Sequence, residues 1–117
     1  MTTRGTVRGY FAALERGEGW QSFLAEDMTF TSLTSPSRSL AGKETFLAAT
    51  KRFYSMIAST EMRDLVVEGE KACALTRYEL RPPAGAPFAS DVAEVFTVHD
   101  GKIVDFTICF DSAPYPK

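Results

Sequence analysis

The sequence predicts an α+β protein in which helices come first and an antiparallel sheet follows. Two observations indicate this class: apolar residues recur at helical spacing through much of the first half, and four alternating runs follow one another in the second half. Helices and strands segregated in this way are typical of α+β domains, whereas parallel βαβ units alternate the two. The chain has 117 residues and no evident linker, so we expect one domain over residues 1–117.

Two helices of similar length are predicted, with a shorter one between them. The first presents one apolar stripe and ends at Gly17, because glycine is common just beyond a helix end. The short helix is predicted over residues 20–25, and the later helix over about residues 43–56, directly after Gly42. The apolar positions that define the first helix are Val7, Tyr10, Phe11 and Leu14.

Alternating residues predict one strand among the helices and four more after them. The early strand covers residues 28–33 and leads into turn chemistry at residues 35–37. The later strands cover about residues 61–67, 72–81, 88–98 and 102–110. Asp100 and Gly101 separate the last two runs, and an Asp-Gly pair in this position is a strong hairpin signal. The four later strands are therefore predicted to form a meander.

Glu94 breaks the alternation of the predicted sheet. Successive side chains of a strand point to opposite faces, so Glu94 lies on the same face as Val92 and Phe96. An ionised carboxylate on an apolar face is costly unless it is paired, and otherwise its pKa rises. Two interpretations stay open from the residues alone: a structural carboxyl, paired with an arginine or placed at a wet edge, and a functional one.

The same parity places the other inward-facing side chains of the sheet. They are Met28, Phe30 and Ser32 on the early strand, Ala74, Thr76, Tyr78 and Leu80 on the second strand of the meander, and Val104, Phe106, Ile108 and Phe110 on the last. A shift of register by one residue would invert each of these faces. Together with Glu94, these side chains would form the inner wall of the sheet.

Composition argues against several classes of partner. The formal net charge is −2 without a basic stripe, so we expect neither nucleic acid nor an anionic membrane as a partner. One histidine and scattered carboxylates show no metal-ligand spacing, and no glycine-rich phosphate loop is evident, so we expect no metal and no cofactor. The two cysteines are too few for a disulfide framework, and we expect a reducing, cytoplasmic location.

Four segments of the chain resemble a known family. They are residues 6–14 (TVRGYFAAL), 26–30 (EDMTF), 41–44 (AGKE) and 94–104 (EVFTVHDGKIV). Together they resemble the ketosteroid isomerase-like, SnoaL-like branch of the nuclear-transport-factor-like superfamily. This superfamily includes isomerases, polyketide cyclases, epoxide hydrolases, dehydratases and non-catalytic binding domains. The resemblance therefore implies a fold more specifically than it implies a reaction.

The implied fold is a cone-shaped, barrel-like structure. Its helices pack in the concave face of a strongly bent, mainly antiparallel sheet, and a pocket opens at the wide end. Members often dimerise through the outer sheet face, so we expect a homodimer; the alternative is a semi-apolar surface without a partner. In this chain the outer face would carry Cys73, Leu75, Ala93, Val95 and Cys109 among polar neighbours.

Catalytic positions carry over from the ketosteroid isomerases one at a time. The resemblance implies that Tyr10 and a protonated Glu94 hold a developing oxyanion, in the way that a neutral carboxylic acid donates a hydrogen bond in that family. The general base of the family falls on Ser32, and a serine hydroxyl without an adjacent base is a poor proton acceptor. Tyr10 also has a plainer interpretation, because a tyrosine on a buried helix stripe is usually part of the core.

Two further positions extend this comparison. A tyrosine that supports the oxyanion tyrosine would align near Thr50, and Tyr54 lies one turn further along the same helix face. Asp111, directly after the last strand, is a candidate acid or base at the pocket mouth; the alternative is an aspartate that only caps the strand end. His99 lies in a predicted hairpin turn, where we expect it to be solvated.

Three functions remain open at this point. The first is an enzyme, an isomerase, cyclase or hydratase, that acts on a small apolar carbonyl compound and uses Tyr10 and Glu94 as oxyanion donors. The second is a binding module for a small apolar or aromatic ligand, and the third is a dimeric accessory domain. The ligand pocket would be lined by Phe30, Ser32, Tyr54, Tyr78, Phe106, Ile108 and Phe110.

Overall fold

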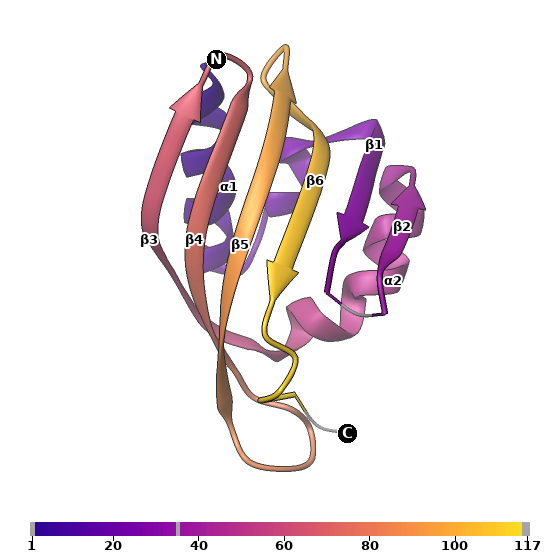
Figure 1. The fold of residues 1–117 in the computed structure, drawn as a ribbon, viewed down its shortest axis with the longest axis vertical. Helices are drawn as coiled ribbons and strands as arrows, with labels where there is room; N and C mark the ends of the chain where they lie inside the picture. Colours follow the sequence, from indigo (N-terminus) through magenta and orange to yellow (C-terminus); the bar gives the residue numbers. More distant parts are fainter. Residues whose placement is uncertain (1, 35, 116–117) are drawn as a thin grey trace.

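The computed structural model describes residues 2–34 and 36–115 and has the α+β architecture that the sequence predicts. A six-stranded sheet curves around two helices, which both lie on its concave face (Figure 1). The strands are β1 (Leu24–Ser32), β2 (Arg38–Ala41), β3 (Ile57–Glu68), β4 (Lys71–Leu80), β5 (Phe88–His99) and β6 (Lys102–Phe110). The spatial order is β2-β1-β6-β5-β4-β3; β1 runs parallel to β6 and every other neighbouring pair is antiparallel.

Helix α1 (Thr3–Arg16) closes one end of the concave face. Thr2 caps it, because its side chain accepts a hydrogen bond from the amide of Gly5 at 2.9 Å. Gly17 ends it in the left-handed conformation, φ 81°, which glycine adopts without a steric penalty. The predicted apolar stripe is buried against β3, β4 and β5. No helix among the described residues is long and apolar enough to cross a membrane.

Helix α2 (Lys43–Met56) covers the other end of the face, over β1 and β2. Its bounds agree with the prediction over residues 43–56. Gly42 precedes it with φ 94°, a backbone conformation that residues other than glycine rarely adopt. Between the helices, the short predicted helix is present only as a 3-10 turn, η1 (Trp20–Phe23), because the last two residues of the predicted segment already belong to β1.

The predicted meander is confirmed, with differences at its ends. Strand β3 begins at Ile57, directly after α2, and is longer than predicted. Strand β2 was not predicted, because its four residues are too few to show an alternating pattern. It follows the connection for which the sequence predicted a turn at residues 35–37, of which residue 35 lies outside the described residues.

An irregularity in the register of β5 and β6 changes one predicted inward position. Thr97 is opposite Asp105, but Val98 is opposite Ile103, so one residue of β6 is skipped. Ile103 is therefore fully buried, and Val104, which parity assigned to the inner face, is only partly buried. The prediction for Val104 was wrong because a bulge reverses the alternation at that point.

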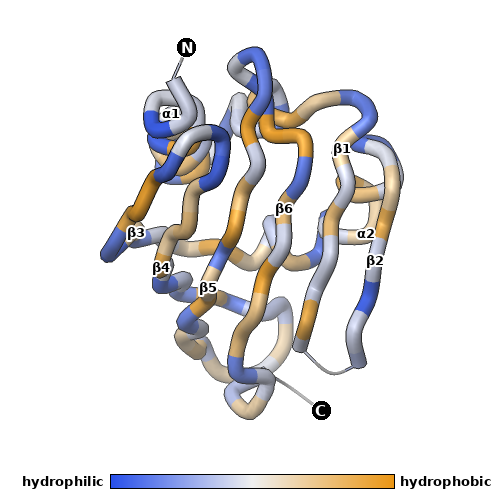
Figure 2. Tube along the Cα trace, turned by 45° about the horizontal axis from the view of Figure 1, so that its top comes forward, coloured by the Kyte–Doolittle hydropathy of each residue, from blue (hydrophilic) through white to orange (hydrophobic). Residues whose placement is uncertain are grey.

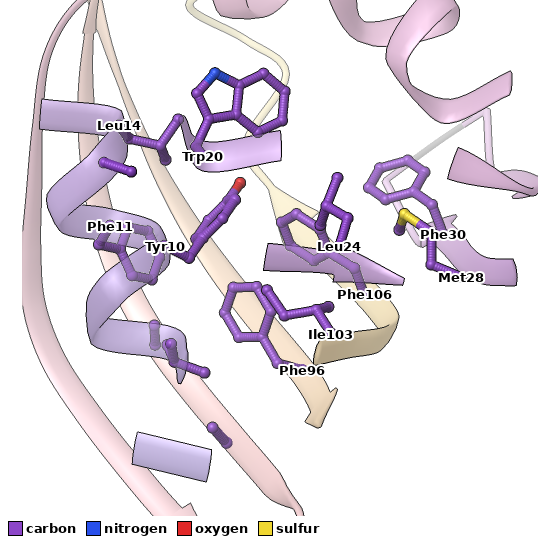
Figure 3. Packing of buried hydrophobic residues seen from close by; sticks show 14 of the residues in the cluster. Tyr10, Phe11, Leu14, Trp20, Leu24, Met28, Phe30, Phe96, Ile103 and Phe106 are labelled. Atoms are coloured by element: carbon purple, nitrogen blue, oxygen red, sulfur yellow. The ribbon is translucent and has the colours of Figure 1, made fainter. Parts of the chain in front are cut away.

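The core lies between the sheet and α1. The rings of Phe96 and Phe106 stack with their centroids 4.6 Å apart, and Tyr10 meets both rings edge-on (Figure 3). Buried residues alternate with more exposed ones along most of β5, and hydrophobic and hydrophilic residues are interspersed along β5 and β6 (Figure 2). Aromatic packing at one end of the concave face leaves the other end, under α2, to form the site.

Candidate functional site

A cavity of about 270 Å³ lies between the concave sheet face and α2. All seven side chains that the sequence assigned to the ligand pocket line it: Phe30, Ser32, Tyr54, Tyr78, Phe106, Ile108 and Phe110. The other lining residues include Phe46 and Phe53 of α2, so the wall is largely aromatic. Such a wall favours flat, apolar molecules and leaves its few polar groups to orient them.

Glu94 lies on the cavity wall, as strand parity predicts. Its side chain is only 2% exposed, and Val92 and Phe96 flank it on the same face of β5. The hydroxyl of Tyr78 donates a hydrogen bond to its Oε1 at 2.7 Å. Its Oε2 is buried without a hydrogen-bond partner among the described residues. One oxygen of the carboxyl is therefore held by Tyr78, and the other is buried without a hydrogen-bond partner among the described residues.

Burial raises the pKa of Glu94 from 4.5 to about 7. The nearby hydroxyls of Thr76 and Tyr78 act in the opposite direction, because they can donate to the charged form. Tyr78 meets Glu94 at hydrogen-bond geometry, whereas Thr76 Oγ1 has no hydrogen-bond partner among the described residues. At neutral pH both the charged and the neutral form of Glu94 are populated.

The structural interpretation of Glu94 would need a nearby arginine, and the arginine on the neighbouring strand pairs with other residues. Among the described residues, no cationic side chain forms an ion pair with Glu94. The arginine of the neighbouring strand, Arg77, points to the outer face, where it pairs with Asp91 and Glu79. Glu94 is therefore buried with hydroxyl and aromatic neighbours instead of a compensating charge.

Tyr10 and Tyr54 form a second polar pair behind the cavity wall. Their hydroxyl oxygens are 2.7 Å apart, and burial raises the pKa of both phenols. Tyr10 is fully buried and does not line the cavity, whereas Tyr54 does. Figure 3 shows the Tyr10 ring between α1 and the phenylalanine pair, with its oxygen directed toward Trp20. The Trp20 indole stacks on the Tyr54 ring with centroids 4.0 Å apart, which fixes the orientation of Tyr54.

The structure divides the predicted catalytic residues into separate pairs. Tyr10 and Glu94, which the resemblance brought together, share no hydrogen bond: Tyr10 bonds to Tyr54, and Glu94 bonds to Tyr78. Because Tyr10 has no other hydrogen-bond partner among the described residues, it can donate to Tyr54, which frees the proton of Tyr54 for the cavity. Of this pair, Tyr54 is the tyrosine that lines the cavity.

Asp111 does not line this cavity. It is exposed, and its Oδ1 accepts a hydrogen bond from the amide of Ala113 at 3.0 Å. It borders a depression on the outer face beside Leu75 and Ala93. This geometry is that of a residue that stabilises the turn after β6. Ser32, in contrast, lines the cavity at the end of β1.

Sequence reasoning missed several polar residues at the cavity, among them Arg38 and Tyr115. Arg38 lines it from β2, the strand that was not predicted. Tyr115 lines it from the C-terminal tail, where its hydroxyl donates to Ser90 Oγ at 2.9 Å and its ring packs against Phe88 and Phe110. Neither position follows a helical or alternating pattern that would have marked it. Among the residues that the structure describes, no group of three or more potential metal ligands is clustered.

Comparisons with known structures identify the fold. A SnoaL-like polyketide cyclase, so named provisionally, from Jannaschia sp. CCS1 matches with a TM-score of 0.76 and 18% identity over 98% of this chain and 93% of that chain. A protein from Kribbella flavida, provisionally named a ketosteroid isomerase, matches with a TM-score of 0.74 and 22% identity over 98% and 82%. At these identities the likeness shows the fold alone, and other similar structures are named NTF2-like.

A third similar structure contains a ligand. It is a protein with a ketosteroid isomerase-like fold from Catenulispora acidiphila, in complex with trimethylamine; it matches with a TM-score of 0.71 and 18% identity over 88% of this chain and 82% of that chain. No curated protein matches the sequence. The sequence pattern of the SnoaL-like domain matches residues 7–106, which is most of the chain. The chain therefore belongs to the SnoaL-like family and has its nuclear-transport-factor-like fold.

Proposed function

We propose that the cavity binds a small, largely apolar carbonyl compound and catalyses a proton transfer on it, as in an isomerisation, cyclisation or hydration. The observation that carries the proposal is the free oxygen of Glu94, which is buried among aromatic side chains on the cavity wall. Native proteins rarely leave a buried carboxyl oxygen unpaired, so this oxygen supports a role toward a ligand.

Glu94 is the acid–base group of the proposed reaction. A proton acceptor works best when its pKa lies near the working pH, and burial raises the pKa of Glu94 to about 7. Its carboxylate removes a proton from the carbon next to the carbonyl, and the resulting acid returns the proton at another position. Glu94 thereby supplies the base that is missing at Ser32, while Tyr78 holds Oε1 in place.

Tyr54 is the donor to the carbonyl oxygen in this scheme. Its ring faces the cavity, and the hydrogen bond from Tyr10 strengthens it as a donor when negative charge develops on the oxygen. Tyr10 therefore has a positioning role behind Tyr54, in place of the direct contact that the resemblance implied. Relatives provisionally named an isomerase and a cyclase are consistent with chemistry at an enolisable carbonyl.

Hydrogen exchange at carbon tests the chemistry without knowledge of the product. The parent protein is incubated in D₂O with a panel of cyclic ketones, such as 1-indanone and 2-tetralone, and NMR follows the loss of the α-proton signals. We expect exchange above background with the parent and a decrease of about 10²-fold or more for Glu94→Gln. Tyr54→Phe removes one oxyanion donor, for which about 10²-fold is typical.

A matched control separates a specific effect from a general one. Glu68→Gln changes an exposed glutamate of β3 outside the cavity and should leave the exchange rate unchanged. If no ketone exchanges faster with the parent than with Glu94→Gln, the catalytic proposal is wrong. Ligand binding without exchange would then favour a binding module of the same fold.

A second candidate function is the binding of an amine. The related protein from Catenulispora acidiphila binds trimethylamine, and aromatic rings around a carboxylate are the usual environment for an ammonium group. Here Phe53, Tyr78 and Phe106 line the cavity together with Glu94. Calorimetry with trimethylammonium distinguishes this function: binding should strengthen as pH rises through about 7, because Glu94 must be ionised, and Glu94→Gln should abolish it.

We also propose that two copies of the chain associate through the outer sheet face. Leu75 and Val95 are 49% and 38% exposed there, although they lie in the middle of the sheet on β4 and β5. Neighbouring Ala93 and Cys73 are only partly buried. Apolar side chains grouped at the centre of an exposed face are typical of the core of an interface.

A further inference from the structure

Arg38 introduces a positive charge into an otherwise apolar cavity. It is the only cationic side chain among the described residues that line the cavity, and none of the ion pairs in the described part of the chain includes it. Glu94 is the only acidic residue in the same lining. The one basic and the one acidic residue of this lining therefore differ in sign, and they do not pair with each other.

The sheet register places these two groups at opposite ends of one row. Arg38 of β2 is opposite Ser32 of β1. Ser32 is opposite Ile108 of β6, and Ile108 is opposite Glu94 of β5. Residues directly opposite one another in a sheet project from the same face, so all four side chains leave the concave face. All four also line the cavity.

This row sets the length scale of a ligand that contacts both ends. Neighbouring strands lie about 4.8 Å apart, so three steps separate the Arg38 and Glu94 backbones by about 14 Å along the sheet. The curvature of the sheet and the inward reach of both side chains shorten the gap that a ligand must fill. Between the ends, the wall is formed by Ile108 and by aromatic rings such as Phe110.

We propose that the ligand is an elongated oxo acid, with an aromatic or alicyclic body, whose carboxylate pairs with Arg38. This proposal rests on the proposed function, which places the carbonyl or enol oxygen at Tyr54 and the neighbouring carbon at Glu94. The guanidinium fork matches a carboxylate with two parallel hydrogen bonds, and Arg38 is exposed at the cavity mouth, so little desolvation opposes the pair. Arg38 would thus determine which of several carbonyl compounds binds, and in which direction.

Three related probes distinguish the contributions of the two ends of the cavity to binding. 2-Naphthol presents a hydroxyl group alone, 6-hydroxy-2-naphthoic acid adds a carboxylate at the far end of the body, and the methyl ester of that acid removes the charge. Calorimetry at about pH 6 keeps most of Glu94 in the neutral form, because burial raises its pKa to about 7. We expect the acid to bind the parent protein about five- to tenfold more tightly than the ester.

Variants of arginines inside and outside the cavity complete the test. Arg38→Gln should remove the preference for the acid and leave the affinities for the ester and for 2-naphthol unchanged. Arg38→Lys should retain part of the preference. Arg52→Gln, an exposed arginine of α2 outside the cavity, should change none of the affinities. Added salt should reduce the advantage of the acid in the parent protein only.

The outcomes distinguish this proposal from the proposed function. If 2-naphthol binds and weakens in Glu94→Gln, but the acid and the ester bind alike, the role of Arg38 is wrong and the carbonyl site stands. If Arg38→Gln weakens all three probes equally, Arg38 only maintains the shape of the cavity, and the proposal is also wrong. If no probe binds the parent protein, the ligand site itself is refuted, and the oxo acid with it.

Discussion

At the scale of single residues, Glu94 makes the stability of the fold depend on pH. Below pH 4.5 the carboxyl is protonated in both the folded and the unfolded chain. Between about pH 4.5 and 7 the unfolded chain ionises while the folded chain keeps its proton, so the free energy of unfolding falls as pH rises. The resulting loss is roughly 3 kcal/mol once both states are ionised.

Urea unfolding of the parent and of Glu94→Gln measures this effect. The glutamine can still accept the hydrogen bond from Tyr78 but does not titrate. We therefore expect the stability of the parent relative to the variant to fall by roughly 3 kcal/mol from about pH 5 to about pH 8. The pKa of His99 is raised by Glu70, so His99 also loses stabilisation as pH rises, but it does so in both proteins. Parallel curves for the two proteins would contradict the burial argument.

The tyrosine pair predicts an asymmetric response to two similar substitutions. Tyr54→Phe leaves the hydroxyl of Tyr10 fully buried without a partner, which costs about 1–3 kcal/mol. Tyr10→Phe should cost less, because the hydroxyl of Tyr54 borders the cavity. The double variant should be more stable than the sum of the two effects predicts, because neither hydroxyl is then left unpaired. Additive losses in a double-mutant cycle would show that the two hydroxyls do not interact.

Local patterns predicted much of the site, and three-dimensional packing decided the rest. Strand parity placed Glu94, and parity with the family resemblance selected seven lining residues, because the alternation of a strand is a local property. Which tyrosine faces the cavity depends on how α1 and α2 are rotated against the sheet, and periodicity does not specify this rotation. Arg38 was missed because a strand of four residues shows no period of its own.

At the scale of elements, the bulge between β5 and β6 decides which residue of the last strand supports the core. The sequence assigned Val104 to the inner face, whereas Ile103 occupies the buried position. We expect Ile103→Ala to destabilise the fold by about 2–5 kcal/mol and Val104→Ala by less than about 1 kcal/mol. Urea unfolding of both variants compares them directly, and a larger loss for Val104→Ala would favour the unbulged register.

The same bulge explains why the alternating pattern of β6 gave a wrong prediction at Val104 but not at the later positions. From Phe106 onward the alternation of β6 is regular, and both Phe106 and Ile108 face inward as predicted. Before Asp105 the skipped residue shifts the pattern by one. A bulge depends on pairing with the neighbouring strand, so a single strand read alone does not reveal it. Helix ends, in contrast, were predicted well because glycines mark them locally, as at Gly17 and Gly42.

At the scale of the whole molecule, the bent sheet separates two sets of side chains between its faces. The concave face holds the aromatic cavity, and the outer face carries salt bridges such as that between Arg77 and Asp91 beside exposed apolar residues. Substitutions on one face should therefore leave the properties of the other unchanged, because the two sets of side chains are separated by the sheet backbone. This separation makes association of two copies testable without disturbing the ligand site.

Leu75→Glu tests the proposed dimer. Leu75 is exposed in the single chain, so a glutamate there should leave folding intact, but in a dimer it would bury a charge without a partner. We expect sedimentation velocity to show a dimer for the parent and a monomer for Leu75→Glu. Leu33→Glu, a change at another exposed leucine that lies beyond β1, should remain dimeric. A monomeric parent, or equal dimerisation of all three proteins, would show that this face is not the interface.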